Sequence, residues 1–424
     1  MFNYTLLSNQ IQDCFNDFSK SLIDGLGVVD KKFIYCMLNG IIKSNSCHLT
    51  KIGRCLHEDI TLKKTEERLS RNLMNFDELD TVHLNYTNYI KLSNMVSSNS
   101  IFYVDESDLA KPNVKSFESL GDVQDGSKEH TWTKGYGITE ITTLYNDEPI
   151  IMQSKLWSTA DKSFISKNKY LYELLDNNFK TFKGSTYVFD RGFDNTDLIK
   201  KIINSDNHFI IRLKQNRKYL INNKKYTVEE ISNKRKGKVV LKTYSSKGLI
   251  TNRLSYVKVN LLGINKPLNL IISYSDNNFE LCYLLTDIEI NNAHDLKVVT
   301  RTYFKRWKIE EFFRFKKQQY NFEDIRVRSI NALRVINSLI NYIITFISMH
   351  TIRNAWLNRE IIKISKPIKT RVFFNYYRLI MGIKMIFDNV IYKVKTYIDN
   401  NIRNINYILK KKSKQLTLFN FDVF

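Results

Sequence analysis

The sequence lacks the features that would place it in a membrane, a secretory route or an oxidising compartment. It has five cysteines among 424 residues, an odd number at irregular spacing, as expected in a reducing compartment. No apolar run reaches the roughly 18 to 20 residues of a membrane span, and the best one, residues 339–348, contains Asn341 and is predicted to be a buried helix. No basic region followed by an apolar core opens the chain, so no signal peptide is predicted. A cytoplasmic protein without a membrane partner is therefore expected.

Common patterns for zinc and nucleotide binding are missing as well. Cys47, His48, Cys55 and His57 match no CxxC framework, so packing is a better interpretation than zinc binding. The cluster at 135–137 lacks the Lys-Ser/Thr of a phosphate loop and lies in a strand-like context. No internal repeat or low-complexity tract is present. The chemistry must therefore come from residues that are distant in the sequence.

Negative charge is scarce relative to positive charge. Lys and Arg number 65 against 43 Asp and Glu, which gives a net charge of +22 and a pI near 9.5. Such an excess indicates a polyanionic partner, with nucleic acid as the first candidate and an anionic membrane surface as the second. Because 43% of the residues are hydrophobic, a folded globular chain is expected, and its length suggests two to four domains.

The stretch 300–330 contains neither glycine nor proline and is predicted to be helical. At about 100° per residue, Tyr303, Arg306, Glu310 and Lys317 fall within an arc of about 60°. A carboxylate beside two cations and a phenol suits a metal-bound phosphodiester, because the carboxylate can hold a hard cation while the other groups hold phosphate oxygens. The alternative is a solvated, salt-bridged helix face, which is common in charge-rich helices.

Two apolar strands upstream each end in an acid. Residues 101–105 end in Asp105, and residues 185–190 end in Asp190. With Glu310 these acids make a predicted triad of hard oxygen ligands. Three carboxylates at one point repel each other unless cations neutralise them, and Mg²⁺ or Mn²⁺, as a pair of ions, suits such ligands. The triad is therefore predicted to be both the metal site and the catalytic site.

Five residues near these motifs leave alternatives open. Asp108 is an alternative to the first aspartate of the triad. Glu311 points about 100° away from the predicted helical edge and is expected to lie outside it. Arg314 lies close to that edge and is predicted to extend it toward nucleic acid, whereas Trp307 is predicted to pack. Arg191 either contacts DNA or pairs with an acid.

The order of strand-like and helix-like segments predicts an α/β protein with helical regions at both ends. In the first region, residues 47–56 and 63–73 are predicted to be helices, the second of them basic, and form either a helix-turn-helix or an ordinary bundle with a basic face. The predicted regions are a helical, DNA-binding part over 1–96, the first part of the core over 101–213, a β-rich insertion over 214–287, the second part of the core over 288–350, and a basic helical part over 351–424.

These motifs resemble those of the DDE transposases of bacterial insertion sequences. The four residues of the predicted helical edge reproduce the Tyr-x2-Arg-x3-Glu-x6-Lys signature of one group, and residues 103–112 and 187–194 look like its two aspartate motifs. The resemblance covers about residues 101–330. It implies a ribonuclease H-like core and Mg²⁺-dependent cut-and-paste transposition. It also implies a homodimer that holds double-stranded terminal repeats and target DNA in the bacterial cytoplasm, at the nucleoid. The Tyr, Arg and Lys of the signature would hold DNA near the scissile phosphate.

One departure and two other functions bear on this prediction. No tryptophan lies between Asp190 and Tyr303, whereas relatives can stack an extruded base on a tryptophan of the insertion, so a hairpin intermediate is a weaker expectation than cleavage. A metal-dependent nuclease without strand transfer would use the same triad. A catalytically silent DNA-binding descendant of a transposase would tolerate loss of an acid, and the presence of all three weighs against it.

Overall fold

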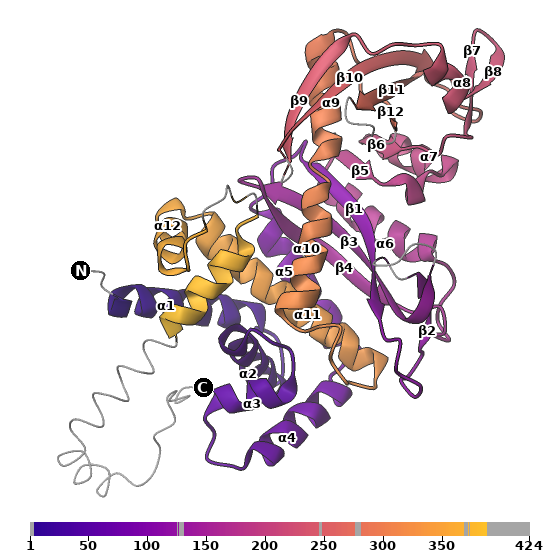
Figure 1. Ribbon diagram of the computed structural model, residues 1–424. Coiled ribbons are helices and arrows are strands. Elements are labelled where there is room, and N and C mark those ends of the chain that lie inside the picture. The colour runs from indigo at the N-terminus through magenta and orange to yellow at the C-terminus, as the bar shows by residue number, and fades with distance from the viewer. Residues whose placement is uncertain are drawn as a thin grey trace, which may run out of the picture.

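The computed structural model describes residues 4–124, 126, 131–245, 248–275, 281–368, 372 and 374–387. One large mixed sheet forms its centre, with helices packed against both faces and a group of N-terminal helices at one end (Figure 1). The predicted α/β class is confirmed.

The five N-terminal helices share one apolar core with α11 (Ile330–Ile347). Leu69 and Leu73 of α4 are fully buried in this core. The two helices predicted over residues 47–56 and 63–73 are α3 and α4. The Thr61 side chain caps α4 by accepting a hydrogen bond from the backbone N–H of Lys64. These helices therefore pack onto the rest of the chain as part of one core. They are α1 (Tyr4–Leu22), α2 (Val28–Ser44), α3 (Leu49–Leu56), α4 (Leu62–Asn75) and α5 (Glu78–Ser93).

The sheet places β1 and β5 side by side. β1 pairs antiparallel with β3 and parallel with β5, and β5 pairs parallel with β6. The full order is β2-β3-β1-β5-β6-β12-β11-β10-β9, with β4 also paired with β3. The strands of this sheet are β1 (Ile101–Ala110), β2 (Gly121–Gln124), β3 (Trp132–Tyr145), β4 (Glu148–Trp157), β5 (Thr186–Phe189), β6 (His208–Arg212), β9 (Val239–Ser245), β10 (Gly248–Val259), β11 (Leu268–Ser275) and β12 (Cys282–Thr286).

The two strands that carry aspartates end differently from each other. β5 ends at Phe189, immediately before Asp190, but β1 continues past Asp105 to Ala110. Because Val104 pairs with Phe189, Asp105 follows the last paired position and lies where the shorter β5 stops. Asp105 therefore lies beside Asp190 because β5 ends there, and not because β1 ends.

Residues 214–287, predicted as a β-rich insertion, extend the central sheet. β12 pairs with the core strand β6, and β11, β10 and β9 follow it in order. A separate two-stranded sheet precedes them, formed by β7 (Lys218–Ile221) and β8 (Lys224–Thr227) and followed by α8 (Val228–Asn233). The insertion is thus joined to the core by main-chain hydrogen bonds as well as by the chain itself.

The stretch predicted as one continuous helix is interrupted. α9 (Ala293–Phe304) ends before Lys305, and α10 (Trp307–Gln319) begins after Arg306, and the two helices lie end to end (Figure 1). At this joint the backbone N–H groups of Arg306 and Ile309 donate to the carbonyls three residues earlier, in the tighter 3₁₀ manner. The helical wheel assumed one continuous helix, so its angles are not exact across the joint, but Arg306 still lies beside Glu310, as the wheel predicts.

The remaining helices cover the sheet and form the apolar core. Residues 339–348 lie mostly in α11, which is buried as predicted. The stretch Ile330–Ile352 is long and apolar enough to cross a membrane, but 89% of its apolar window is buried inside the protein, as in the core helix of a globular fold. The predicted basic C-terminal region is described only to residue 387, so Lys410–Lys414 lie outside the described residues. The other helices are α6 (Lys167–Thr181), α7 (Thr196–Asn204) and α12 (Ala355–Ile364).

Candidate active site

The three predicted acids meet around the guanidinium of Arg306. Its Nη1 donates to Asp105 Oδ2 at 2.7 Å, and its Nη2 donates to Glu310 Oε1 at 2.5 Å. Asp190 Oδ1 lies 3.9 Å from the same Nη2. One planar cation thus neutralises acids from β1, from the residue after β5 and from α10.

The α9–α10 joint is what brings Arg306 to this point. The joint places Tyr303 at the end of α9 and Glu310 in the first turn of α10, on either side of Arg306. The Tyr303 hydroxyl donates to Asp190 Oδ1 at 3.2 Å, so the phenol orients the second aspartate. Tyr303 and Arg306 are both buried, whereas the Glu310 side chain is 56% exposed and faces solvent at the mouth of the site.

Burial and mutual repulsion shape the charges of the site. Burial raises the pKa of Asp105 to about 7, against the opposing effect of Arg306 and with a further increase from Asp190. Burial acts to lower the pKa of Arg306, but the carboxylates of Asp105 and Asp190 outweigh it, so this pKa is raised above its ordinary value. The pKa of Tyr303 is also raised by burial. The Asp105 carboxyl, with its raised pKa, therefore loses its proton near neutral pH and not in the acid range.

The acids fit a divalent cation by donor type, but in this arrangement the guanidinium lies among them. Carboxylate oxygens are the ligands that Mg²⁺ and Mn²⁺ prefer. Within the described part of the chain, no three His, Cys, Asp or Glu side chains are close enough together to hold a metal ion. Arg306 bridges Asp105 and Glu310 directly, so a metal ion would have to replace its guanidinium.

Cys47, one of the four residues of the zinc alternative, lies inside the protein. Cys47 is buried, and its thiol donates to the carbonyl of Tyr320 at 3.0 Å. Burial raises the pKa of this thiol to about 12, which disfavours the thiolate that zinc requires. Cys47 is a packing residue, as predicted.

The other predicted DNA contacts lie away from the acids. Lys317 pairs with Asp108 at 3.3 Å and with Glu323 at 3.2 Å, so neither Lys317 nor Asp108 joins the acid cluster. Lys317 shares a face of α10 with Glu310 but lies roughly 10 Å further along the axis, since each residue adds about 1.5 Å.

Arg314 is exposed and pairs with Glu311 at 2.5 Å. Outside α10, Arg191 is exposed in the turn after Asp190, and Trp307 is partly exposed rather than fully packed.

Two clamps that were not predicted hold α10 in place. At its start, Lys308 donates to the backbone and side-chain oxygens of Asp147 in the β3–β4 turn, and Lys305 pairs with the same aspartate at 3.1 Å. Beyond its end, Lys111 donates to the carbonyls of Glu323 and Ile325. The turn at 146–147 can be predicted from the sequence, but its lysine partners, more than 150 residues away, carry no local signal.

The Lys111 clamp predicts an unusual dependence of stability on pH. Lys111 is 3% exposed, and burial lowers its pKa from 10.5 to about 8. Between these values the folded protein binds fewer protons than the unfolded chain, so the free energy of unfolding should rise with pH, by at most about 3 kcal/mol. Urea unfolding of the wild type between about pH 7.5 and 9.5 should show this rise in the free energy of unfolding. The range stops at about pH 9.5 because tyrosines begin to ionise above it. Lys111→Met should remove most of it, and an equal rise in both proteins would contradict the assignment.

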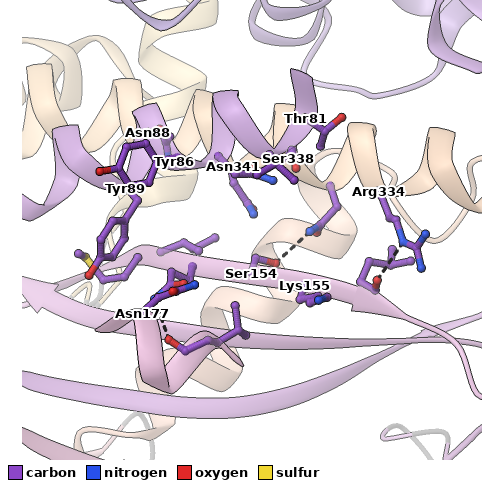
Figure 2. Close-up of a pocket in the computed structure, with 18 of the residues that line it drawn as sticks. Thr81, Tyr86, Asn88, Tyr89, Ser154, Lys155, Asn177, Arg334, Ser338 and Asn341 are labelled. Atoms are coloured by element: carbon purple, nitrogen blue, oxygen red, sulfur yellow. Dashed lines mark hydrogen bonds between the residues drawn. The ribbon is translucent and has the colours of Figure 1, made fainter. Parts of the chain in front are cut away.

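A separate cavity of about 640 Å³ lies between α5, α6, α11 and β4. Figure 2 shows that polar side chains are among those that line it, with Asn88, Asn341 and Ser338 on the helices and Ser154 and Lys155 on β4. None of the predicted acids lines it. The cavity is therefore not the site at which the acid cluster acts.

A mixed sheet that brings acids from β1, from the end of β5 and from a covering helix to one point defines a ribonuclease H-like core. Residues 99–346 match the family model described as the transposase DDE domain, and the chain belongs to this family. Its ribonuclease H-like fold class is thus as predicted.

Two further comparisons gave different results. Among solved structures, the chain is similar to one described as "Cryo-EM structure of piggyBac transposase synaptic complex with hairpin DNA". The identity is 13% and the TM-score is 0.45, over 96% of this chain and 76% of that chain. A search of curated proteins found no match.

Proposed function

We propose that this transposase cuts DNA at transposon ends and joins the freed ends to target DNA, with Mg²⁺ or Mn²⁺ held by Asp105, Asp190 and Glu310. The observation that carries the proposal is that these three acids, from segments far apart in the chain, converge on one cation. A solvated salt-bridge surface would not need acids from two neighbouring strands at the same point as the helix acid. The resemblance to the insertion-sequence group with the Tyr-Arg-Glu-Lys signature supports the same reaction.

The chain's own residues would prepare the site in a defined order. When bound, a pair of divalent cations would supply activation of the attacking hydroxyl and stabilisation of the departing 3′ oxygen. Asp105 must first lose its proton, which its raised pKa makes favourable only near or above neutral pH. Arg306 must leave the carboxylates, and its guanidinium is then free to bind a phosphate of the DNA through two hydrogen bonds. Tyr303 keeps Asp190 in place during this exchange.

DNA is the proposed partner, held by a dimer, and the protein is proposed to act in the bacterial cytoplasm at the nucleoid. Lys64 and Arg71 are exposed on α4, the second helix of the pair for which a helix-turn-helix and an ordinary bundle with a basic face were the two alternatives. Deleting the whole N-terminal region would be an unsuitable test, because α1 to α5 share their core with α11 and the rest of the protein would lose packing. Point variants on α4 avoid this problem.

Binding to non-specific duplex should be steeply dependent on salt, because a chain with a charge of +22 releases counterions from DNA. We expect affinity to fall by a factor on the order of 10³ between about 50 and 200 mM salt. Replacing Lys64 and Arg71 with alanine should lower the slope by about two if each contacts a phosphate. Fluorescence anisotropy with a labelled duplex measures both effects.

Lys180→Ala is the control, because it also removes a positive charge from an exposed helix surface, that of α6. It should leave the slope near that of the wild type. A flat salt response in the wild type would exclude an electrostatically held nucleic acid as the partner.

The proposed reaction is tested with a duplex that carries inverted repeats read from the DNA flanking the gene. Cleavage at the repeat and joining of the new 3′ end to a second duplex would support the proposal. Cleavage without joining would identify a nuclease, and sequence-specific binding without cleavage would identify a silent descendant.

A further inference from the structure

A buried ion pair fastens α10 to the sheet. Lys316 Nζ donates to Glu140 Oε1 at 2.5 Å, and the side chains are 2% and 0% exposed. Lys316 lies six residues after Glu310 on α10, and Glu140 lies in β3. The pair takes no part in the proposed chemistry, since neither residue contacts the acid cluster.

The pair belongs to a closed ring of hydrogen bonds that joins four elements. Lys316 also donates to Asn337 Oδ1 on α11 at 2.7 Å. Asn337 Nδ2 in turn donates to Ser154 Oγ on β4 at 2.9 Å, and Ser154 Oγ donates to Glu140 Oε1 at 2.7 Å. Figure 2 shows Ser154 on β4, below α11, with its hydrogen bond drawn as a dashed line. The ring holds α10, α11, β3 and β4 in one arrangement.

The ring contacts the sheet at residues that are in register with Asp105, the first acid of the predicted triad. Asp105 on β1 is paired in register with Glu140 on β3, and Glu140 is paired with Ser154 on β4. These three residues form one row across the sheet, and residues directly opposite each other on neighbouring strands point to the same face. A shift of α10 along or about its axis would move Glu310 relative to Asp105, and it would also break this ring. The ring therefore opposes such a shift.

Stability alone is a poor explanation for the pair. Glu140 Oε2 has no hydrogen-bond partner, although it is buried. Burial acts to lower the pKa of Lys316, and the Glu140 carboxylate opposes this effect. Apolar residues of similar volume often replace a buried ion pair with no loss of stability, while a directional pair specifies one arrangement among several. We propose that Glu140 and Lys316 are positioning residues, which set α10 so that Glu310 meets Asp105 and Asp190.

The double variant Glu140→Leu with Lys316→Met separates positioning from stability. We expect its unfolding midpoint in urea to stay close to that of the wild type, because both buried charges are removed together and Asn337 can still donate to Ser154. Its affinity for Mn²⁺, measured by calorimetry, should nevertheless fall by a factor on the order of 10 or more, because the three acids no longer share one geometry. The single Lys316→Met variant should be strongly destabilised, since it leaves a buried carboxylate without a cation.

The pair of Arg334 and Asp161, 2.6 Å apart and less buried, is the control. It ties α11 to the segment after β4 and does not touch α10. Replacing it with Met and Leu should leave Mn²⁺ affinity unchanged. A Glu140→Leu, Lys316→Met protein that is stable and binds Mn²⁺ like the wild type would overturn the proposal.

Hydrogen exchange of the α10 amides is a second measurement that does not depend on metal. In the double variant these amides should exchange faster than in the wild type, while the α11 amides keep their protection. The metal measurement rests on the proposed function, and a wild type that binds no Mn²⁺ would count against that function. The exchange measurement would then decide alone, and unchanged protection of α10 would refute the positioning role.

Discussion

Asp190→Asn should abolish cleavage and joining of end DNA and leave the protein folded. Asparagine keeps the shape of the side chain and can still accept the Tyr303 hydrogen bond, but it loses the charge that holds a divalent cation. Because metal-assisted stabilisation contributes several kcal/mol to such a reaction, the single-turnover rate should fall by a factor on the order of 10³ or more. The cost in stability should be small, since the Asp190 side chain is partly exposed and lies 3.9 Å from Arg306.

The measurement is cleavage of a labelled end duplex at saturating protein, with circular dichroism and thermal unfolding to check the fold. Asp197→Asn, at an exposed acid in the first turn of α7, is the matched control and should cleave normally. Asp108→Asn tests the alternative ligand. If it abolished cleavage while Asp105→Asn did not, the first member of the triad would be Asp108, despite its pairing with Lys317.

Arg306→Ala should bind metal more tightly than the wild type and yet cleave DNA more slowly. Removing the guanidinium frees the carboxylates that a metal ion needs, so Mn²⁺ affinity should rise by about tenfold or more. The same guanidinium is the group proposed to bind the DNA phosphate, so cleavage should fall by a factor on the order of 10² through misplacement of the substrate. Metal-free Arg306→Ala should also lose stability, by roughly 3 kcal/mol, because three carboxylates then face each other without a cation. Added Mn²⁺ should restore much of it.

Calorimetry with Mn²⁺, urea unfolding with and without the ion, and single-turnover cleavage measure these three effects. Arg306→Lys keeps a positive charge but cannot bridge two carboxylates as a planar fork does, so its effects should be intermediate. Arg314→Ala removes an exposed arginine from the same helix and should leave metal affinity unchanged. If Arg306→Ala showed wild-type affinity and wild-type cleavage, the contact seen between Arg306 and the acids would have no functional consequence.

The sequence by itself was sufficient to predict the parts of the site that depend on local signals. The apolar runs before Asp105 and Asp190 predicted two buried strands, because the signal for a strand is contained in a short run of neighbouring residues. The absence of glycine and proline predicted the helix of Glu310, and the excess of Lys and Arg indicated a polyanion as partner. The α/β class followed from the order of these elements.

Other features depended on the packing of distant segments and carried no local signal. At the joint between α9 and α10, Lys305 and Lys308 both bind Asp147, which lies in a turn far upstream. Asp105 is uncovered by the end of β5, which the sequence of β1 cannot reveal. Lys316 would be taken for a solvated lysine until Glu140 is found opposite it.

The placement of Arg306 illustrates the difference between the two kinds of information. A helical wheel can place Arg306 near Glu310, since the two are four residues apart. It cannot show that acids from two strands, more than 100 residues upstream, complete the ring of charge around the guanidinium. Which charges meet is set by the packing of α10 on β1 and β5, because electrostatic energies depend on distance in space and not on separation along the chain.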